Sequence, residues 1–243
     1  MQATWTFSNS DVVAVQVLVA QYAKAPLVVS RKASISVPVQ ACSKADFWDK
    51  LVAAVLSSQQ QWHKVAAFLA TSPLPLPAAQ GNNFQVVAQS ALAAGGQRFP
   101  ERWGKALAKN VAWLDQQDAQ GNDGWNEMSQ HAGQLVTVWG APAPAAITAE
   151  RAAARWASSR LRGVGPKQSR NLWQMLGLSR FEIPLDSRVM SWLNDLGSSP
   201  KLSATALADR HFYEWVLDGV QDLCSQAGVL PCIFDAAVFV HLG

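Results

Sequence analysis

Cysteine and histidine are both scarce in this chain, with three cysteines and four histidines among 243 residues. Cys42, Cys224 and Cys232 are an odd number without CxxC spacing, which argues against a disulfide framework and against a four-thiolate zinc or iron-sulfur site. The histidines show no metal-ligand spacing either. We therefore expect the protein to need no metal and no other cofactor.

Long apolar runs are also absent. No stretch approaches the ~18 consecutive apolar residues of a membrane span, and the opening MQATWTFSNSDVV lacks the basic start and apolar middle of a secretory signal. Hydrophobic residues still make up 49% of the chain and charged residues only 15%, which is typical of a folded core. We expect a soluble cytoplasmic protein that does not associate with membranes.

Helical periodicity dominates what is present, because apolar residues recur three and four positions apart. Ser43 with Asp46 predicts a capping box, and Thr148 predicts a second helix start. The exception is 26–40, whose β-branched and roughly alternating sequence predicts an extended segment. Helices are predicted near residues 10–24, 44–58, 61–71, 83–94, 101–118, 124–138, 148–160, 166–177, 187–196, 205–226 and 232–241.

Positive charge is concentrated in one stretch. Residues 150–180 contain seven basic side chains against one acid, so this stretch sums to +6 and the rest of the chain to −3. A local positive potential attracts polyanions even where the total charge is small. The stretch therefore predicts nucleic acid as the partner.

The segment LRGVGPKQSRNLWQMLG, residues 161–177, predicts a helix-hairpin-helix. Gly163 and Gly165 allow a tight turn and a close approach to another molecule, Val164 anchors the turn, and Pro166 suits the first position of the next helix. Free amides at that helix start favour a phosphate, a contact that does not read sequence. Further DNA contacts are predicted for Arg162, Ser169, Arg170 and Arg188.

Lys167 and Asp186 are the candidate reactive pair. Lys167 is a cation in the first turn of a helix, at the unfavourable end of the dipole, so a compensating role is expected: docking a phosphate, or acting as a partly desolvated amine that attacks carbon. Asp186 precedes Ser187-Arg188-Val189 and could simply cap that helix. Its combination with the hairpin favours a functional role.

The combination of LRGVGPKQSR and IPLDSRV resembles the helix-hairpin-helix DNA glycosylases, whose signature is a hairpin, a Gly/Pro-rich turn and an aspartate further on. The resemblance covers about residues 43 to 240 and is most specific from the hairpin to the aspartate. It implies that Asp186 is catalytic. Because bifunctional members have a lysine at the position of Lys167, it also implies strand cleavage and points to the 8-oxoguanine branch.

The resemblance extends to the handling of the extruded base. The polar run Ser57-Ser58-Gln59-Gln60 resembles the family's helix end that enters the gap left by the nucleotide, which makes Gln59, with Gln60 beside it, a candidate DNA contact. Asp235 is expected to cap the last helix, with reading of a base edge as the alternative. Candidates for the base pocket are thus Trp62, Phe181, Phe234 and Asp235.

We expect an all-α fold in which two helical subdomains, 1–42 plus 178–243 and 43–177, flank a DNA-binding cleft with the hairpin at the cleft. The expected activity is removal of a damaged or modified base, such as 8-oxoguanine, from double-stranded DNA by a monomer of bacterial type acting at the nucleoid. Two alternatives stay open. One is a glycosylase for an alkylated base or a hypermodified cytosine of foreign DNA, and the other is a non-catalytic hairpin DNA-binding module.

Overall fold

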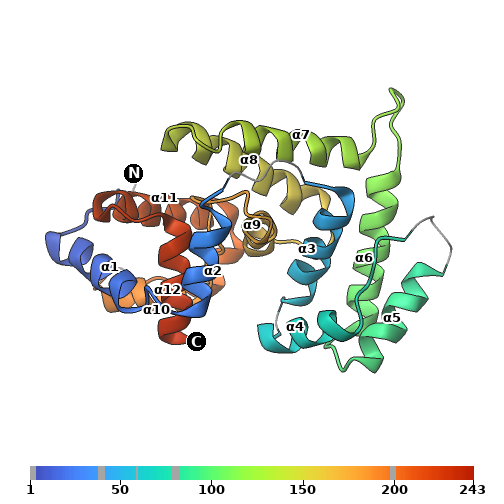
Figure 1. Cartoon of the computed structure of the whole chain (residues 1–243), viewed down its shortest axis with the longest axis horizontal. Helices are drawn as coiled ribbons and strands as arrows, with labels where there is room; N and C mark the ends of the chain where they lie inside the picture. Colours follow the sequence, from blue (N-terminus) through green and yellow to red (C-terminus); the bar gives the residue numbers. More distant parts are fainter. Residues whose placement is uncertain (1–3, 38–41, 59, 78–82, 198–200) are drawn as a thin grey trace.

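The computed structural model describes residues 4–37, 42–58, 60–77, 83–197 and 201–243. These residues form twelve α-helices and one short 3-10 helix, and no strand occurs among them (Figure 1). The predicted all-α fold is confirmed. The helices are α1 (Asn9–Gln21), α2 (Pro26–Ser34), α3 (Lys44–Leu56), α4 (Trp62–Thr71), α5 (Phe84–Ala94), α6 (Pro100–Asp115), α7 (Gly124–Thr137), α8 (Ala143–Arg160), α9 (Pro166–Met175), α10 (Ser187–Asp195), η1 (Ala204–Ala208), α11 (Arg210–Ala227) and α12 (Pro231–Leu242).

The predicted extended segment at 26–40 is wrong over its described part, because α2 occupies Pro26–Ser34. Pro26 stands at the first helical position, where its missing amide costs nothing. Val28 is fully buried in the core formed by the chain ends. Burial of one helical face has therefore overridden the β preference of the local sequence.

The two predicted caps have different outcomes. Ser43 and Asp46 form the capping box, with the Ser43 Oγ accepting from the Asp46 amide at 3.0 Å, so that prediction is confirmed. Thr148 does not begin a helix, because α8 starts at Ala143, where prolines are tolerated in the first turn. The Thr148 hydroxyl instead donates to the Pro144 carbonyl one turn earlier, at 2.8 Å.

Two hydrophobic cores organise the molecule. The first is built by α3 to α9 and centres on Phe47, whose ring lies 5.6 to 6.2 Å from those of Trp125, Trp156 and Trp173. The second combines both chain ends, α1, α2 and α10 to α12. Figure 1 shows them as two halves with α9 between them. The division into subdomains stays a prediction that is compatible with these cores.

In the part of the chain that the structure describes, no single helix is long and apolar enough to cross a membrane. Most tryptophans lie in or against the cores, as their helical spacing predicts. Trp62 is the exception among the tryptophans, all of which the structure describes, with 45% of its surface exposed.

Candidate active site

Helices α8 and α9 flank a short turn at residues 161–165, an arrangement compatible with the predicted helix-hairpin-helix. Gly163 has φ +79°, in the left-handed region that favours glycine, and a Cβ there would lie 3.3 Å from Trp103. Val164 is 4% exposed and packs into the first core. Val164 thus anchors the turn in the core, and the two glycines present only their backbone to a ligand.

The start of α9 has the features of an anion site. Gly165 occupies the N-cap position, and no side chain of a described residue caps the helix. The amides of the first turn therefore keep their capacity to donate to an external anion, and the helix dipole favours one. A Cβ on Gly165 would meet only the Gln168 side chain, at 3.8 Å, so the space in front of the turn is open.

Lys167 and Asp186 lie next to each other in the structure. The Lys167 Nζ lies 3.2 Å from the Asp186 Oδ2, although nineteen positions separate them in the sequence. The Lys167 side chain is 38% exposed and the Asp186 side chain 15%. An amine and a carboxylate thus share one site that is largely shielded yet accessible at the start of α9.

Asp186 caps α10 and also makes the ion pair. Its Oδ1 accepts from the Arg188 amide at 2.9 Å, while its Oδ2 accepts from the Arg188 guanidinium at 2.6 Å. That guanidinium lies 3.8 Å from the centroid of the Phe239 ring. Burial alone would raise the pKa of Asp186, but the Arg188 hydrogen bond and the Lys167 charge outweigh it and hold the pKa below its usual value. The carboxyl is therefore an anion at neutral pH, oriented by Arg188.

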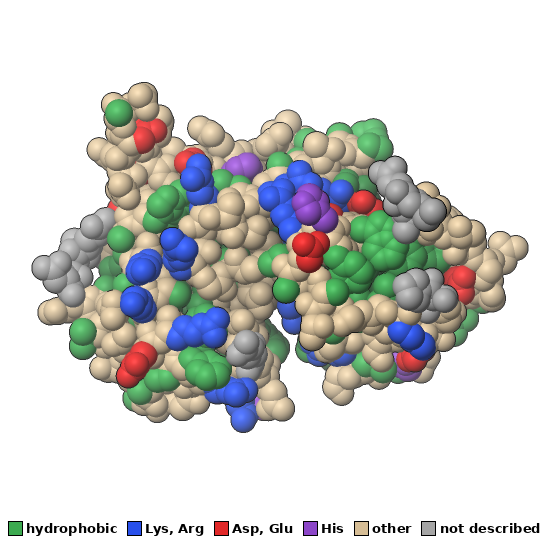
Figure 2. Space-filling model, turned by 180° about the vertical axis from the view of Figure 1, so that it is seen from behind, with side chains coloured by type: hydrophobic (Ala, Val, Ile, Leu, Met, Phe, Trp, Pro, Cys, Tyr) green, Lys and Arg blue, Asp and Glu red, His purple; other side chains and the backbone are tan. Residues whose placement is uncertain are grey.

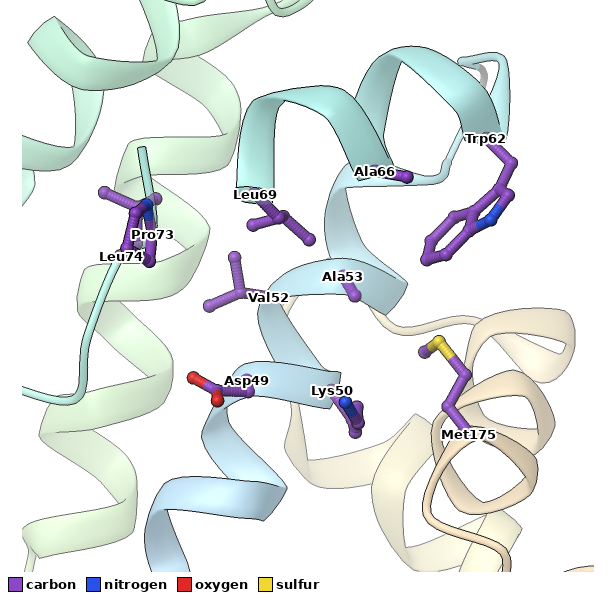
Figure 3. A pocket seen from close by; sticks show the side chains of 10 residues that line it. All are labelled: Asp49, Lys50, Val52, Ala53, Trp62, Ala66, Leu69, Pro73, Leu74 and Met175. Atoms are coloured by element: carbon purple, nitrogen blue, oxygen red, sulfur yellow. The ribbon is translucent and has the colours of Figure 1, made fainter. Parts of the chain in front are cut away.

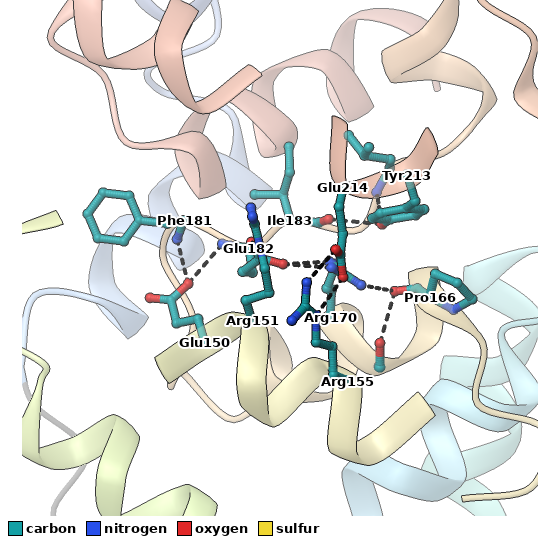
Figure 4. Close-up of polar contacts among 12 residues, drawn as sticks. Glu150, Arg151, Arg155, Pro166, Arg170, Phe181, Glu182, Ile183, Tyr213 and Glu214 are labelled. Atoms are coloured by element: carbon teal, nitrogen blue, oxygen red, sulfur yellow. Dashed lines mark hydrogen bonds and ion pairs between the residues drawn. The ribbon is translucent and has the colours of Figure 1, made fainter. Parts of the chain in front are cut away.

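A buried ion-pair network fixes the distance between α9 and the segment before Asp186 (Figure 4). The Arg170 side chain is 3% exposed, and it donates to the Glu182 carboxylate at 2.8 Å and to the Pro166 carbonyl at 3.0 Å. Arg151 of α8 donates to the same carboxylate at 2.8 Å. Because Pro166 precedes Lys167 and Glu182 lies four residues before Asp186, this network positions both members of the candidate pair.

The segment 179–185 has no regular structure and is held by buried side chains. The Glu150 carboxylate accepts from the backbone amides of Phe181 and Glu182, each at 2.8 Å (Figure 4). It also accepts from the Arg180 amide at 3.0 Å. The Tyr213 hydroxyl donates to the Ile183 carbonyl at 3.0 Å and accepts from the Leu185 amide at 2.6 Å. These contacts satisfy the backbone polar groups that a buried loop would otherwise leave unpaired.

A polar cluster lies beyond the reactive pair. Asp235 is inside α12, four residues after its start, so the predicted capping role is wrong. Burial raises the pKa of Asp235 to about 6; the charge of Arg31 opposes the shift, that of Asp186 adds to it, and that of Lys167 opposes it. The Asp235 carboxyl is therefore within electrostatic reach of both members of the pair and is half protonated near pH 6.

Gln174 completes this cluster. It follows Lys167 by seven residues, two turns along the same face of α9. It is 2% exposed, and its side-chain amide lies next to the Asp235 carboxyl but has no hydrogen bond of ordinary geometry within the described residues. The Arg31 guanidinium donates to the backbone carbonyl of Gln174 at 3.3 Å. A buried amide with an unused donor and acceptor is a candidate for recognising a polar ligand edge.

Two of the predicted DNA contacts are corrected by burial. Ser169 is fully buried and donates to the Pro166 carbonyl, while Arg170 is bound to Glu182, so neither side chain is free for a phosphate. The Arg188 side chain is 28% exposed and forms an ion pair with Asp186. Arg162 is exposed beside the turn and remains a candidate contact.

The candidates near the end of α3 also differ from expectation. Gln59 lies outside the described residues. Gln60 accepts from the Arg98 amide at 2.8 Å and donates to Gln97, so its side chain holds the 97–98 turn, which corrects its predicted DNA contact. Trp62 faces Met175 across a hollow of about 370 Å³ between α3, α4 and the end of α9 (Figure 3). Trp62 therefore remains a candidate stacking surface.

The two phenylalanines are not part of the site. Phe234 is fully buried against Trp192 in the second core, with ring centroids 4.9 Å apart, because α12 is apolar on that face. Phe181 borders a separate hollow between α8 and the α11–α12 connection, which neither Lys167 nor Asp186 lines. Both predictions of a base-stacking role are corrected by these positions.

Comparison with known proteins finds no family model and no curated protein that matches the sequence. Solved structures do match its fold. The 8-oxoguanine DNA glycosylase of Thermotoga maritima superposes with a TM-score of 0.67 at 13% identity, covering 96% of this chain and 97% of that chain. The 8-oxoguanine DNA glycosylase of Methanocaldococcus jannaschii gives 0.64 at 11% identity, with 95% and 92% covered.

A second structure from Methanocaldococcus jannaschii, an 8-oxoguanine glycosylase/lyase in complex with 15mer DNA containing 8-oxoguanine, also gives 0.64, at 10% identity with 95% and 98% covered. At these identities the similarity shows a shared fold over nearly the whole chain. The helical architecture implied by the hairpin motif is therefore confirmed, and the chemistry has to be argued from the residues of the site.

Proposed function

We propose that this protein is a DNA glycosylase that removes a damaged or modified base, with an oxidised purine such as 8-oxoguanine as the first candidate, and then cleaves the strand at the abasic site. The observation that carries the proposal is the Lys167 amine 3.2 Å from the Asp186 carboxylate, beside the uncapped start of α9. The structural neighbours, which are 8-oxoguanine DNA glycosylases, support it.

Binding precedes the chemistry. The glycosidic bond of a stacked base is inaccessible, so the nucleotide has to be extruded at a cost of a few kcal/mol. The α9 amides and the turn around Gly163 and Gly165 would hold a backbone phosphate next to the site. Gln59 is the proposed side chain that fills the gap left in the duplex.

The covalent step uses both members of the pair. Asp186 accepts a proton from the Lys167 ammonium, and the freed Nζ lone pair forms a bond to C1′ while the C1′–base bond breaks and its electrons leave with the base, which takes up a proton. The Asp186 carboxylate also stabilises positive charge on the sugar. The Nζ–C1′ adduct then loses a proton and opens the sugar ring: the C1′–O4′ bond breaks, O4′ takes up a proton, and the Nζ lone pair forms the protonated Schiff base with C1′. This Schiff base acidifies C2′, and loss of a C2′ proton expels the 3′ phosphate.

The extruded base would lie against the cluster beyond the pair. A base bonded to C1′ at Lys167 extends toward Asp235 and Gln174, which follows Lys167 on the same face of α9. The unused donor and acceptor of the Gln174 amide suit a base edge that carries an acceptor beside a donor. We assign these two side chains to base recognition, with Trp62 as a further candidate.

Borohydride trapping on a duplex with an 8-oxoguanine tests the proposal. The wild-type chain is expected to form a covalent complex, and Lys167→Gln to form none while keeping its DNA affinity within about threefold, because one exposed cation contributes little to binding. Lys24→Gln, which changes another exposed lysine, is the control and should trap like the wild type.

The outcomes separate the alternatives. Trapping by Lys167→Gln at the wild-type level would assign the nucleophile to another residue. A wild-type chain that binds duplex DNA but neither traps nor releases any base would be a non-catalytic DNA-binding module. A panel of duplexes, each with one altered base including alkylated bases and modified cytosines, identifies the substrate.

A further inference from the structure

The basic stretch at 150–180 offers less charge to a ligand than its sequence indicates. Four of its arginines are bound to carboxylates inside the protein, and Arg180 lies over the Trp139 ring at 4.8 Å. Lys167 is paired with Asp186. The arginine pairs are Arg151 with Glu182 and Asp218, Arg155 with Glu214, Arg160 with Glu127, and Arg170 with Glu182. Most of this charge is therefore neutralised, and a DNA backbone needs cations from another element.

Helix α6 has such cations. Arg102, Lys105 and Lys109 are exposed, recur at helical spacing on one face, and take part in no ion pair among the described residues. No acidic residue occurs between Arg102 and Leu114. We call these three residues the α6 basic stripe. It is about 10 Å long, the axial rise over which one DNA strand carries about three phosphates.

The α6 basic stripe lies beside the hairpin turn. A Cβ on Gly163 would lie 3.3 Å from Trp103 and 3.7 Å from Ala106, so these α6 residues face the turn. Asn110 binds the Arg162 backbone, donating to its carbonyl at 3.0 Å and accepting from its amide at 2.6 Å.

Each stripe residue directly precedes one of these three contact residues of α6. Consecutive residues are about 100° apart around a helix, so all three stripe residues lie next to the face of α6 that contacts the turn. Arg102 is also preordered, because its guanidinium lies 4.4 Å from the centroid of the Trp103 ring. Figure 2 shows Lys and Arg side chains gathered over the half that holds α3 to α7, with few acidic side chains among them, and a hollow between the halves.

We propose that the α6 basic stripe is a second phosphate-binding surface, which holds the backbone of duplex DNA to one side of the nucleotide engaged by the hairpin. The proposal rests on the proposed DNA-binding function and adds a surface to it. The stripe fits a polyanion with regularly spaced charges, because its cations follow one line and take part in no ion pair among the described residues. It does not take part in the chemical step.

The test compares the triple variant Arg102→Gln, Lys105→Gln, Lys109→Gln with the triple variant Lys24→Gln, Lys44→Gln, Lys201→Gln, which loses the same charge from exposed sites outside α6. Binding is measured against salt on a duplex of about 30 base pairs with a central tetrahydrofuran abasic analogue. The stripe variant should bind about tenfold more weakly and lower the slope of log K against log salt by about 2 to 3. The control variant should keep the wild-type slope.

Shortened duplexes give an independent readout. Removing DNA on one side of the abasic analogue should abolish the difference between wild type and stripe variant, and removing it on the other side should preserve it. The single-turnover rate of base release at saturating protein should stay within about twofold of wild type, because the stripe acts in binding.

Equal salt slopes for the stripe variant and the wild type, or equal losses in both triple variants, would overturn the proposal. The two proposals also fail separately. If the wild type releases no base and the stripe variant still binds DNA more weakly, the second phosphate-binding surface is supported and the glycosylase proposal is rejected. If the wild type releases base and the stripe variant binds DNA as the wild type does, the glycosylase proposal is supported and the second surface is rejected.

Discussion

Asp186 combines two roles in one side chain, because it caps α10 and pairs with Lys167. Asn is as good an N-cap as Asp, so Asp186→Asn should keep the helix start while removing the negative charge. We expect the variant to fold and bind DNA but to release base about 10²- to 10³-fold more slowly, the usual cost of losing a charge-stabilising group. Single-turnover base release and thermal unfolding measure the two roles separately.

Asp209→Asn is the matched control, since Asp209 caps α11 by accepting from the Phe212 amide at 2.7 Å. It should leave base release unchanged. Wild-type rates in Asp186→Asn would remove Asp186 from the mechanism and leave it as a cap.

The residues that sequence could predict are those with a local signal. Lys167 and Asp186 stand out because one follows a glycine turn and the other starts a helix after proline. Gln174 has a weaker signal, its position two turns after Lys167 on one helix face. Arg31 has none, because its contact with the Gln174 carbonyl depends on how α2 packs across the molecule.

Within the hairpin, the two glycines differ: Gly163 needs its positive φ, whereas Gly165 can be replaced without backbone strain. Gly165→Leu should fold, since Gly165 has an ordinary φ of −89° and open space before it, but the new side chain would cover the α9 amides. Affinity for duplexes of different sequence should fall equally, by about 10- to 100-fold, because a hydrogen bond to a charged group is worth about 1.5 to 3 kcal/mol. Fluorescence anisotropy on three unrelated duplexes measures this.

Gly133→Leu is the control, because Gly133 lies in α7 with nothing within 4 Å of a Cβ. Its affinity should equal that of the wild type. A loss in Gly165→Leu that is confined to one DNA sequence would contradict a backbone contact at the turn.

Helix prediction succeeded where apolar periodicity and burial agree, and it failed where they conflict. The amphipathic spacing of α10 and α11 matches the faces that are buried in the second core. In α2 the β-branched residues predict a strand, yet the described chain ends offer no strand to pair with and a helical face buries Val28 instead. The partner of a segment, which sequence does not reveal, decided its structure.

At the scale of the whole molecule, ion pairs join the two cores. Arg155 of α8 donates to Glu214 of α11 at 2.8 Å, and Arg210 donates to the same carboxylate at 3.2 Å. The Arg155 hydrogen bond, opposed by burial, lowers the pKa of Glu214 to about 2. A folded pKa below the unfolded value stabilises the protein above pH 4.5, and this stability is lost as the pH falls toward 2.

Glu214→Gln should therefore lower the free energy of unfolding by about 1 to 2 kcal/mol at pH 7, a value reduced by the exposure of both arginines, and by little near pH 2. Denaturant unfolding at several pH values measures the difference. Asp195→Asn, at an exposed carboxyl without an ion pair in the described structure, is the control and should not change the pH profile. A destabilisation independent of pH would assign the effect to packing.

The helices next to Lys167 and Asp186 pack in different cores. Lys167 is on α9, whose Leu172 and Trp173 are in the first core, whereas Asp186 caps α10, whose Val189 and Met190 are in the second. Any motion that moved the two cores apart would lengthen the 3.2 Å separation of Nζ and Oδ2. The separation on which the proposed proton transfer depends is therefore set by how the two cores pack against each other.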